Sequence, residues 1–304
     1  MNGPRVGLSL PLGAGVGDAA GRAERLGFDY VSVGEHLAFH GPSANGFVAL
    51  AAAAGATRRI GLLSSVTLAP LYPAALLAKL VASLDDVSGG RFTLGIGVGG
   101  EHEAEFDAVG VPKAQRGART DEAITVVRRL LAEDDVRFDG RFTTLSGLTI
   151  QPRPKGGTVP VWVAGRSVAA MRRAALLGDG WMPYLYTPQR LADSVRRVRS
   201  IARDENRGSW SGQVAAHLFT TVHPDGARAR RTAVEQVSGT YRQDFGPLAD
   251  RYLVHGDAQT CARRVREYVD AGAGTIVLRL AAPADELYSM TRRVAEELVP
   301  ALAT

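Results

Sequence analysis

The sequence has a single cysteine, Cys261, among 304 residues. One cysteine excludes an internal disulfide and a metal site built from several thiolates. The pattern around Cys261 is helical, so we expect it to be a buried or half-buried helix residue. HExxH motifs and histidine pairs with the spacing of metal ligands are also absent, and we therefore expect no metal site.

The sequence also lacks long apolar runs, charge runs and linkers. No stretch reaches the length of a membrane span, and Arg5 leads directly into the apolar segment VGLSLP, so we expect a soluble cytoplasmic protein with no membrane partner. The net charge is +5, but no basic run with interleaved aromatics occurs, which argues against nucleic-acid binding. No segment rich in Pro, Gly or Ser divides the chain, so we expect residues 1–304 to form a single domain.

The most regular stretch, from Ile60 to Glu101, predicts a strand, a helix and a second strand. An apolar segment stops at Pro70, leucines at helical spacing follow, and Phe92 to Val98 is again apolar. Two strands separated by a helix of this length are normally parallel and joined by a right-handed crossover. Both strands end in small residues, which leave room for a flat ligand at the carboxyl ends of parallel strands.

The same alternation continues along the whole chain. We predict eight strands, each followed by a helix, near residues 6, 31, 62, 94, 161, 181, 218 and 277. Eight such units fit one α/β domain of the (β/α)8 TIM-barrel type with insertions in the βα loops, and a doubly wound open sheet is the competing architecture. The Asp-Gly pair within residues 138–144 predicts a hairpin.

Glu35 and His36 are the first candidates for chemistry. An acid and a base at the carboxyl end of a barrel strand suit proton transfer, and the alternative is a helix-capping acid beside a hydrogen-bonded histidine. His40 follows in a loop, where it would touch solvent or ligand. Glu101, after the strand that ends at Val98, is either a second acid of the site or a solvent-facing residue.

Two turns could approach a ligand with their backbone. The segment AGRS ends a strand and opens a helix with Ser167 as the expected N-cap, so free N–H groups, the helix dipole and Arg166 would converge on a phosphate. Ordinary helix capping is the alternative. GIGVGGE, residues 95–101, allows close approach of a flat ring or a phosphate, or is simply a tight turn. No helical pattern follows it directly, so it is a poor dinucleotide-binding motif.

Five segments occur in an order that resembles one family. They are AERLGFDYVSVGEH, SSVTLAPLYPAALLAKLVASLDDVSGGRFTLGIGVGGE, QRGARTDEA, VPVWVAGRS and LGDGW. From Arg5 to about Leu280 the chain is similar to the bacterial luciferase-like superfamily of flavin- and deazaflavin-dependent oxidoreductases, whose fold is a TIM barrel.

The resemblance implies roles for individual residues. It implies a non-prolyl cis peptide between Ser65 and Val66 against the cofactor ring, and catalytic roles for Glu35, His36 and Glu101. The implied cofactor-binding residues are Ser64, Ser65, Val66, Gly97, Gly99, Gly100, Ala164, Gly165, Arg166 and Ser167.

One departure from the family bears on the substrate. The family's sugar-phosphate dehydrogenases carry a Trp four residues after the strand-two histidine, where this chain has His40, which argues against sugar-phosphate oxidation. We expect an apolar and aromatic pocket that takes a small organic substrate larger and less polar than a sugar. The expected pocket residues are Phe39, His40, Tyr72, Trp181, Tyr184 and Tyr186.

The family uses either FMN or coenzyme F420. Reduced FMN activates dioxygen and would make the chain a monooxygenase, with a flavin reductase as a possible partner. F420 is a hydride carrier and would make it a dehydrogenase or reductase. The segment QRGARTDE looks closest to a subgroup usually assigned to F420, and the positive net charge suits the oligoglutamate tail of F420, so we favour F420.

Other interpretations stay open. Family members are commonly dimers, and the helices expected over 47–56 and 73–87 have small-residue faces that could pack across a two-fold axis or against the barrel itself. The chain could also be a cofactor-free barrel enzyme that acts on a phosphorylated substrate at residues 165–167. It could equally be a non-catalytic ligand-binding barrel, or a subunit that acts only with a partner.

Overall fold

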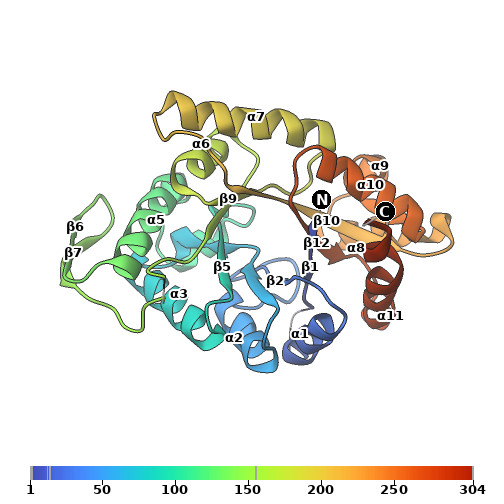
Figure 1. Ribbon diagram of the computed structural model, residues 1–304, viewed down its shortest axis with the longest axis horizontal. Coiled ribbons are helices and arrows are strands. Elements are labelled where there is room, and N and C mark those ends of the chain that lie inside the picture. Colours follow the sequence, from blue (N-terminus) through green and yellow to red (C-terminus); the bar gives the residue numbers. More distant parts are fainter. Residues whose placement is uncertain (1–2, 12, 14, 155, 303–304) are drawn as a thin grey trace.

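The structure, a computed structural model, describes residues 3–11, 13, 15–154 and 156–302 (Figure 1). Eight parallel strands close into a barrel, because β1 pairs with β2 on one side and with β12 on the other. Every other pair around the ring is also parallel. The strands are β1 Arg5–Ser9, β2 Tyr30–Val33, β3 Gly61–Ser64, β5 Phe92–Gly97, β8 Val161–Ala164, β9 Gly180–Met182, β10 Gln213–Val222 and β12 Thr275–Leu280. The predicted TIM barrel is confirmed.

Helices surround the barrel on its outside (Figure 1). Their ends follow ordinary capping chemistry: α3 ends at Gly89, whose φ of 70° is left-handed and favours glycine, and the Asp225 side chain accepts a hydrogen bond from the first turn of α8. The helices are α1 Val16–Arg25, α2 Gly46–Ala56, α3 Ala74–Ser88, α5 Arg116–Ala132, α6 Val168–Leu177, α7 Pro188–Asp204, α8 Gly226–Tyr241, α10 Ala258–Asp270 and α11 Leu287–Arg293. Cys261 lies buried in α10, as expected.

Several short elements decorate the barrel, and most were not predicted. The hairpin at 138–144 is confirmed as the turn between β6, Val136–Asp139, and β7, Thr144–Leu148, which project beyond the ring of helices in Figure 1. The short elements that the sequence analysis missed are β4 Thr67–Leu68, α4 Ala104–Ala108, α9 Ala249–Tyr252, β11 Val254–Gly256 and α12 Val299–Leu302. Segments of two to five residues are too short to show a periodicity.

The side chains of the strands form two layers of core. Every second residue of a strand points into the barrel, where Leu63 and Val277 pack together with Tyr30, Trp162 and Met182. Val31, Ile96 and Val163 belong to the larger cluster that includes residues of the surrounding helices. The inward-pointing side chains fill the inside of the barrel. A ligand therefore has room only at the mouth, which is the end formed by the carboxyl ends of the strands.

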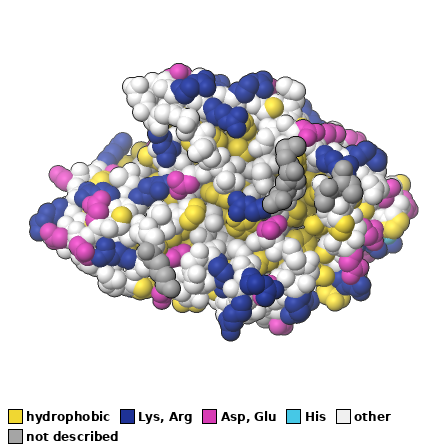
Figure 2. All heavy atoms as spheres, viewed as in Figure 1, with side chains coloured by type: hydrophobic (Ala, Val, Ile, Leu, Met, Phe, Trp, Pro, Cys, Tyr) yellow, Lys and Arg dark blue, Asp and Glu magenta, His cyan; other side chains and the backbone are white. Residues whose placement is uncertain are grey.

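The surface shows mixed charge. Lys and Arg side chains are spread over the face seen in Figure 2 and do not gather into one stripe. Among the described residues, none of the helices combines the length and the apolar composition that a membrane span requires.

Candidate functional site at the carboxyl ends of the barrel strands

Glu35, at the end of β2, acts as a structural acceptor. Its carboxylate accepts hydrogen bonds from the backbone N–H of Gly46 at 3.0 Å and of Leu68 at 2.9 Å, and from the Tyr72 hydroxyl at 3.0 Å. The side chain is buried, and burial raises the pKa of Glu35 while these hydrogen bonds act in the opposite direction. This geometry corresponds to the helix-capping alternative, because Gly46 is the first residue of α2. Glu35 therefore ties α2 and β4 to β2, and its oxygens are already engaged.

The acid that contacts His36 is Glu105. Both oxygens of this carboxylate lie 3.1 Å from His36 Nδ1, and one of them also accepts from the backbone N–H of Leu37 at 2.7 Å. Glu105 is only 1% exposed. A carboxylate that already accepts backbone N–H groups needs a donor from the ring, so His36 carries its proton on Nδ1 and leaves Nε2 as the acceptor. The pair is a Glu–His dyad.

Sequence reasoning missed Glu105, because it lies in the irregular segment after Glu101. The short helix α4, only five residues long, places its side chain next to β2, 69 positions away from His36. A spacing of four residues between Glu101 and Glu105 was the only signal in the sequence. That spacing shows two acids on neighbouring turns, but it does not say which of them meets the histidine.

Glu101 lies at the mouth of the barrel and pairs with Tyr184. The Tyr184 hydroxyl donates a hydrogen bond to the Glu101 carboxylate. Burial raises the pKa of Tyr184, and the nearby Glu101 charge raises it further, so the phenol stays protonated as a donor. The Arg166 guanidinium lies over the Tyr184 ring at 5.0 Å. These three residues join the ends of β5, β8 and β9 at one place.

The peptide bond between Ser65 and Val66 is cis, as predicted. Glycines surround this segment because side chains would not fit: a Cβ on Gly95 would lie 1.8 Å from Ser64 O, and a Cβ on Gly97 would lie 2.6 Å from Val66 Cγ2. Ser64, predicted to bind cofactor, is buried instead, and its hydroxyl bonds both the N–H and the C=O of Gly95. Ser64 therefore holds the cis segment against β5 through these two hydrogen bonds.

The glycine turn after β5 meets the start of α5. Gly99 and Gly100 have φ values of 62° and 109°, in the left-handed region that favours glycine. A Cβ on Gly100 would lie 3.1 Å from Arg116 Nε, so the missing side chain allows the guanidinium to approach the turn. The segments GIGVGGE and QRGARTDE, separate in the sequence, thus form one wall of the mouth.

The AGRS turn has the geometry of an anion site. Ser167 is the N-cap of α6, since its hydroxyl accepts a hydrogen bond from Ala170 N at 3.2 Å, as predicted. Gly165 has a φ of 123°, and a Cβ there would lie 2.8 Å from Ala170 Cβ. The N–H groups of Val168 and Ala169, in the first turn of α6, have no acceptor within the helix. They are free for an anion beside the half-exposed Ala164.

Three of the predicted pocket residues lie elsewhere. Trp181 is fully buried and donates from Nε1 to Gly165 O at 3.0 Å, and Tyr186 is 2% exposed and packs edge-on against Trp181. Both side chains lie in the core next to the AGRS turn and stabilise it. Tyr72 is engaged with Glu35 through its hydroxyl. These aromatic residues point outward from the barrel, which their spacing in the sequence did not show.

Phe39, His40 and Tyr184 do lie at the mouth. The Phe39 ring stacks on His36 with centroids 4.3 Å apart, and the exposed His40 ring is 4.6 Å from Phe39. Two further residues that sequence reasoning did not select join them: His102 lies 6.5 Å from Phe39, and Tyr241, at the end of α8, lies 6.3 Å from it. Aromatic residues from four separate segments therefore border the space above His36.

Both the sequence and the fold of this chain match known proteins. The sequence model of the luciferase-like monooxygenase family matches residues 11–275. The chain belongs to the luciferase-like family. A similar protein, the F420-dependent glucose-6-phosphate dehydrogenase of Intrasporangium calvum, is 29% identical over 315 residues that cover 92% of each chain.

Solved luciferase-like structures share the fold. The monooxygenase RslO1 from Streptomyces bottropensis superimposes with a TM-score of 0.86 at 25% identity, over 97% of this chain and 99% of that chain. An F420-dependent secondary alcohol dehydrogenase in complex with an F420-acetone adduct has a TM-score of 0.85 at 22% identity and full coverage of both chains. As a member of this family the protein is an oxidoreductase, and the family uses F420 or FMN.

The residues present suit a flat ring with a phosphate. Glycines at the turn after β5 and the free N–H groups of α6 provide space and donors, as described above. Thr67, directly after the cis segment, is 1% exposed, and its Oγ1 has no hydrogen-bond partner among the described residues. A buried hydroxyl without a partner is costly, and a bound ligand would satisfy it. Within the same residues, no three His, Cys, Asp or Glu side chains are grouped as metal ligands.

Proposed function

We propose that this protein is an F420-dependent dehydrogenase or reductase that transfers a hydride between the cofactor and a small organic substrate. The observation that carries the proposal is the His36–Glu105 dyad at the mouth of the barrel. Removal of a hydride from an alcohol carbon requires that the hydroxyl proton leave as well, so the enzyme needs a base beside the cofactor ring. His36 Nε2 is such a base.

Each residue of the site then has a physical role. Glu105 keeps the Nδ1 proton in place and stabilises the imidazolium that forms when Nε2 takes the substrate proton. Phe39, stacked on His36, fixes the ring plane and excludes water from one of its faces. The N–H groups of α6 would hold the cofactor phosphate, and Ser65 and Val66 would lie against the ring. When bound, the deazaflavin supplies the hydride acceptor or donor.

The arginines around the two ligand-facing turns favour F420 over FMN. Arg116 lies against Gly100, Arg166 follows Gly165, and Arg190 donates to Arg166 O at 3.4 Å. FMN ends in one phosphate, whereas F420 continues from its phosphate into a glutamate tail with several carboxylates. Guanidinium groups at both ligand-facing turns, Arg116 at the glycine turn and Arg166 and Arg190 at the AGRS turn, suit this longer anionic chain.

Side-by-side titration of the purified protein with F420 and with FMN tests the cofactor. We expect F420 to bind at least tenfold more tightly than FMN, with a preference that weakens at high salt because the tail contacts are electrostatic. Equal or tighter binding of FMN would reject F420 as the cofactor and favour a monooxygenase that depends on a flavin reductase. Failure to bind either cofactor would favour the cofactor-free or partner-subunit interpretation.

A further inference from the structure

The mouth of the barrel has two chemically different sides. The side formed by β3, β5 and β8 carries the cis segment and the glycines, which suit the cofactor. The opposite side is formed by β10, β12 and β1, since these strands lie across the ring in the strand order. A substrate that faces the cofactor ring must contact this opposite side, so its side chains determine which substrates fit.

Arg279 supplies a positive charge on that side. Val277 points into the barrel, so the alternation of the strand places Arg279, two residues nearer to the mouth, on the same face. Its guanidinium lies 5.1 Å from the centroid of the Phe219 ring, and the exposed Arg279 side chain makes no hydrogen bond or ion pair with any residue that the structure describes. The acid on the other rim, Glu101, is paired with Tyr184. Arg279 is therefore a cation at the mouth without a protein counter-ion.

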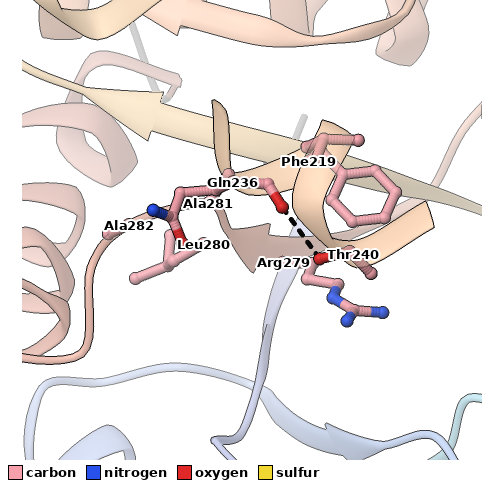
Figure 3. A pocket seen from close by; sticks show the side chains of 8 residues that line it. Phe219, Gln236, Thr240, Arg279, Leu280, Ala281 and Ala282 are labelled. Atoms are coloured by element: carbon pink, nitrogen blue, oxygen red, sulfur yellow. Dashed lines mark hydrogen bonds between the residues drawn. The ribbon is translucent and has the colours of Figure 1, made fainter. Parts of the chain in front are cut away.

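A small pocket adjoins this guanidinium. It lies between α8 and the carboxyl ends of β10 and β12 and has a volume of about 80 Å³. In Figure 3 the Arg279 side chain extends away from Ala281 and Ala282, on the same side as the Phe219 ring. Phe219, Thr240 and Leu280 also line the pocket. The lining combines one cation and the polar residues Gln236 and Thr240 with the apolar side chains of Phe219 and Leu280, which suits an acidic group attached to a flat apolar body.

Aromatic rings frame the space between Arg279 and His36. Tyr241 packs edge-on against Phe219, at 5.9 Å between centroids, and edge-on against Phe39, at 6.3 Å. Phe39 in turn stacks on His36. Aromatic residues thus connect the cation on one strand with the base on another, and flat rings pack well against such edges and faces.

Below the space between Arg279 and His36, toward the inside of the barrel, one buried polar atom has no hydrogen-bond partner among the described residues. His217 lies on β10 two residues below Phe219, and its Nε2 is 3.4 Å from Ser9 Oγ, while its buried Nδ1 has no partner among the described residues. Ser9 Oγ is 2.9 Å from Ser32 Oγ. A ligand with a polar atom near its centre would form the hydrogen bond that His217 Nδ1 lacks.

We propose that the substrate is a small aromatic carboxylate, whose acid group pairs with Arg279 and whose ring lies between Phe39, Phe219 and Tyr241. This inference rests on the proposed function, since it takes the cofactor to occupy the glycine-lined side. In this orientation the part of the substrate opposite the carboxylate reaches His36 Nε2. The carboxylate then determines which end of the substrate meets the base.

The test compares benzoate with its neutral analogue benzamide by calorimetric titration, on the protein alone and on the protein saturated with F420 or FMN. We expect benzoate to bind at least tenfold more tightly than benzamide. Arg279→Met keeps the length and apolar character of the side chain and removes the charge, and it should abolish this preference. Arg199→Met, at an exposed position on α7, is the matched control and should leave the preference intact.

Three results would overturn the proposal: no binding of benzoate, equal binding of benzoate and benzamide, or a preference that survives Arg279→Met. Cofactor affinity is measured in the same preparations. If Arg279→Met weakens the cofactor as much as benzoate, Arg279 belongs to the cofactor site and the proposal is wrong. If the parent protein binds neither cofactor but prefers benzoate through Arg279, the carboxylate site is supported while the proposed function fails.

Discussion

At the scale of single residues, the site depends on which acid contacts His36. Glu35 is adjacent to His36 in the sequence, but its carboxylate accepts from Gly46 and Leu68 on the other side of β2. Glu105 is distant in the sequence and contacts His36 Nδ1. Both residues follow the end of β2 at Val33 and their side chains meet different partners, so adjacency along the chain did not decide which acid contacts the histidine.

The dyad predicts the tautomer of His36. In Glu105→Gln the amide oxygen can still accept from Leu37 N, and the amide NH2 then faces Nδ1, so the ring must move its proton to Nε2. We expect 15N chemical shifts of labelled protein to show the Nδ1–H form in the parent and the Nε2–H form in Glu105→Gln. Turnover should fall about 100-fold, at the lower end of what a general base contributes.

Glu103→Gln is the matched control for this experiment, because Glu103 is an exposed acid two residues away whose carboxylate lies 3.6 Å from Lys113 Nζ. It should change neither the tautomer nor the turnover. Cofactor affinity should stay within about threefold of the parent in both variants, since the Glu105 side chain faces His36 and the Glu103 side chain faces Lys113 rather than the glycine turn. An unchanged tautomer in Glu105→Gln would contradict the dyad.

His217 predicts a pH-dependent stability. Burial, with the Arg279 charge nearby, lowers the pKa of His217 to about 3 from the ordinary value of 6.5. Below about pH 6.5, His217 binds a proton in the unfolded chain but not in the folded protein. Protonation therefore favours the unfolded state, and His217 lowers the stability of the fold as the pH falls. Between pH 7 and pH 5 the loss should be about 2 kcal/mol.

Chemical denaturation of the parent and of His217→Gln at the two pH values isolates this effect, because all other groups are shared. We expect the difference in unfolding free energy between pH 7 and pH 5 to be smaller in the variant by about 2 kcal/mol. The same pH dependence in both proteins would show that His217 is protonated in the folded state.

At the scale of elements, each wall of the site comes from a strand end and the segment that follows it. The turn after β5 supplies glycines, the turn after β8 supplies the first N–H groups of α6, and the end of α8 supplies Tyr241. Helix α6 makes the most direct prediction, because its N-terminus combines unpaired N–H groups with the positive end of the helix dipole.

Replacement of Ser167 by Asp places a carboxylate where the cofactor phosphate is expected. Asp is as good an N-cap as Ser, so the thermal stability of the apoprotein should change little. The carboxylate competes for the same N–H groups and repels the phosphate, and cofactor affinity should fall at least tenfold, or about 1.4 kcal/mol. Ser167→Ala controls for the loss of the hydroxyl alone. Parent-like cofactor binding by Ser167→Asp would place the phosphate elsewhere.

At the scale of the whole molecule, one face of the barrel carries exposed apolar side chains. Val48 on α2 is 72% exposed and Leu76 on α3 is 50% exposed. Helix α2 contains no charged residue, although half of its length faces outward. Exposed apolar side chains on two adjacent helices offer a surface for association with a partner. We propose that a second copy of the chain packs here, as the small-residue helices led us to expect.

The dimer has a simple test. We expect light scattering at micromolar concentration to give twice the monomer mass of 32.2 kDa. The double change of Val48 and Leu76 to Asp would bury two charges per subunit in the interface, so it should raise the dissociation constant at least tenfold and produce monomers. Val109→Asp, at a less exposed apolar position outside α2 and α3, is the control. A monomeric parent protein would reject the dimer.

The sequence by itself determined the barrel and the positions of its ligand-facing turns. Eight strand–helix alternations, the N-cap at Ser167 and the hairpin at 138–144 depend on local periodicity and on turn chemistry, which act between residues close in the chain. The cis peptide at Ser65 and Val66 followed from the family resemblance. Ser64, Trp181 and Tyr186, expected to be ligand contacts, have buried side chains, because the side of a strand end on which a side chain lies depends on packing.

Only the tertiary structure decided which residues meet at the mouth. Closure of the barrel brings Glu105 to His36 and Tyr241 to Phe39, and it leaves Arg279 opposite the glycine turns. These contacts join segments separated by tens to hundreds of positions, so no local pattern encodes them. Short elements such as α4 and β11 depend in the same way on neighbours supplied by the rest of the fold, since a few residues cannot form stable structure alone.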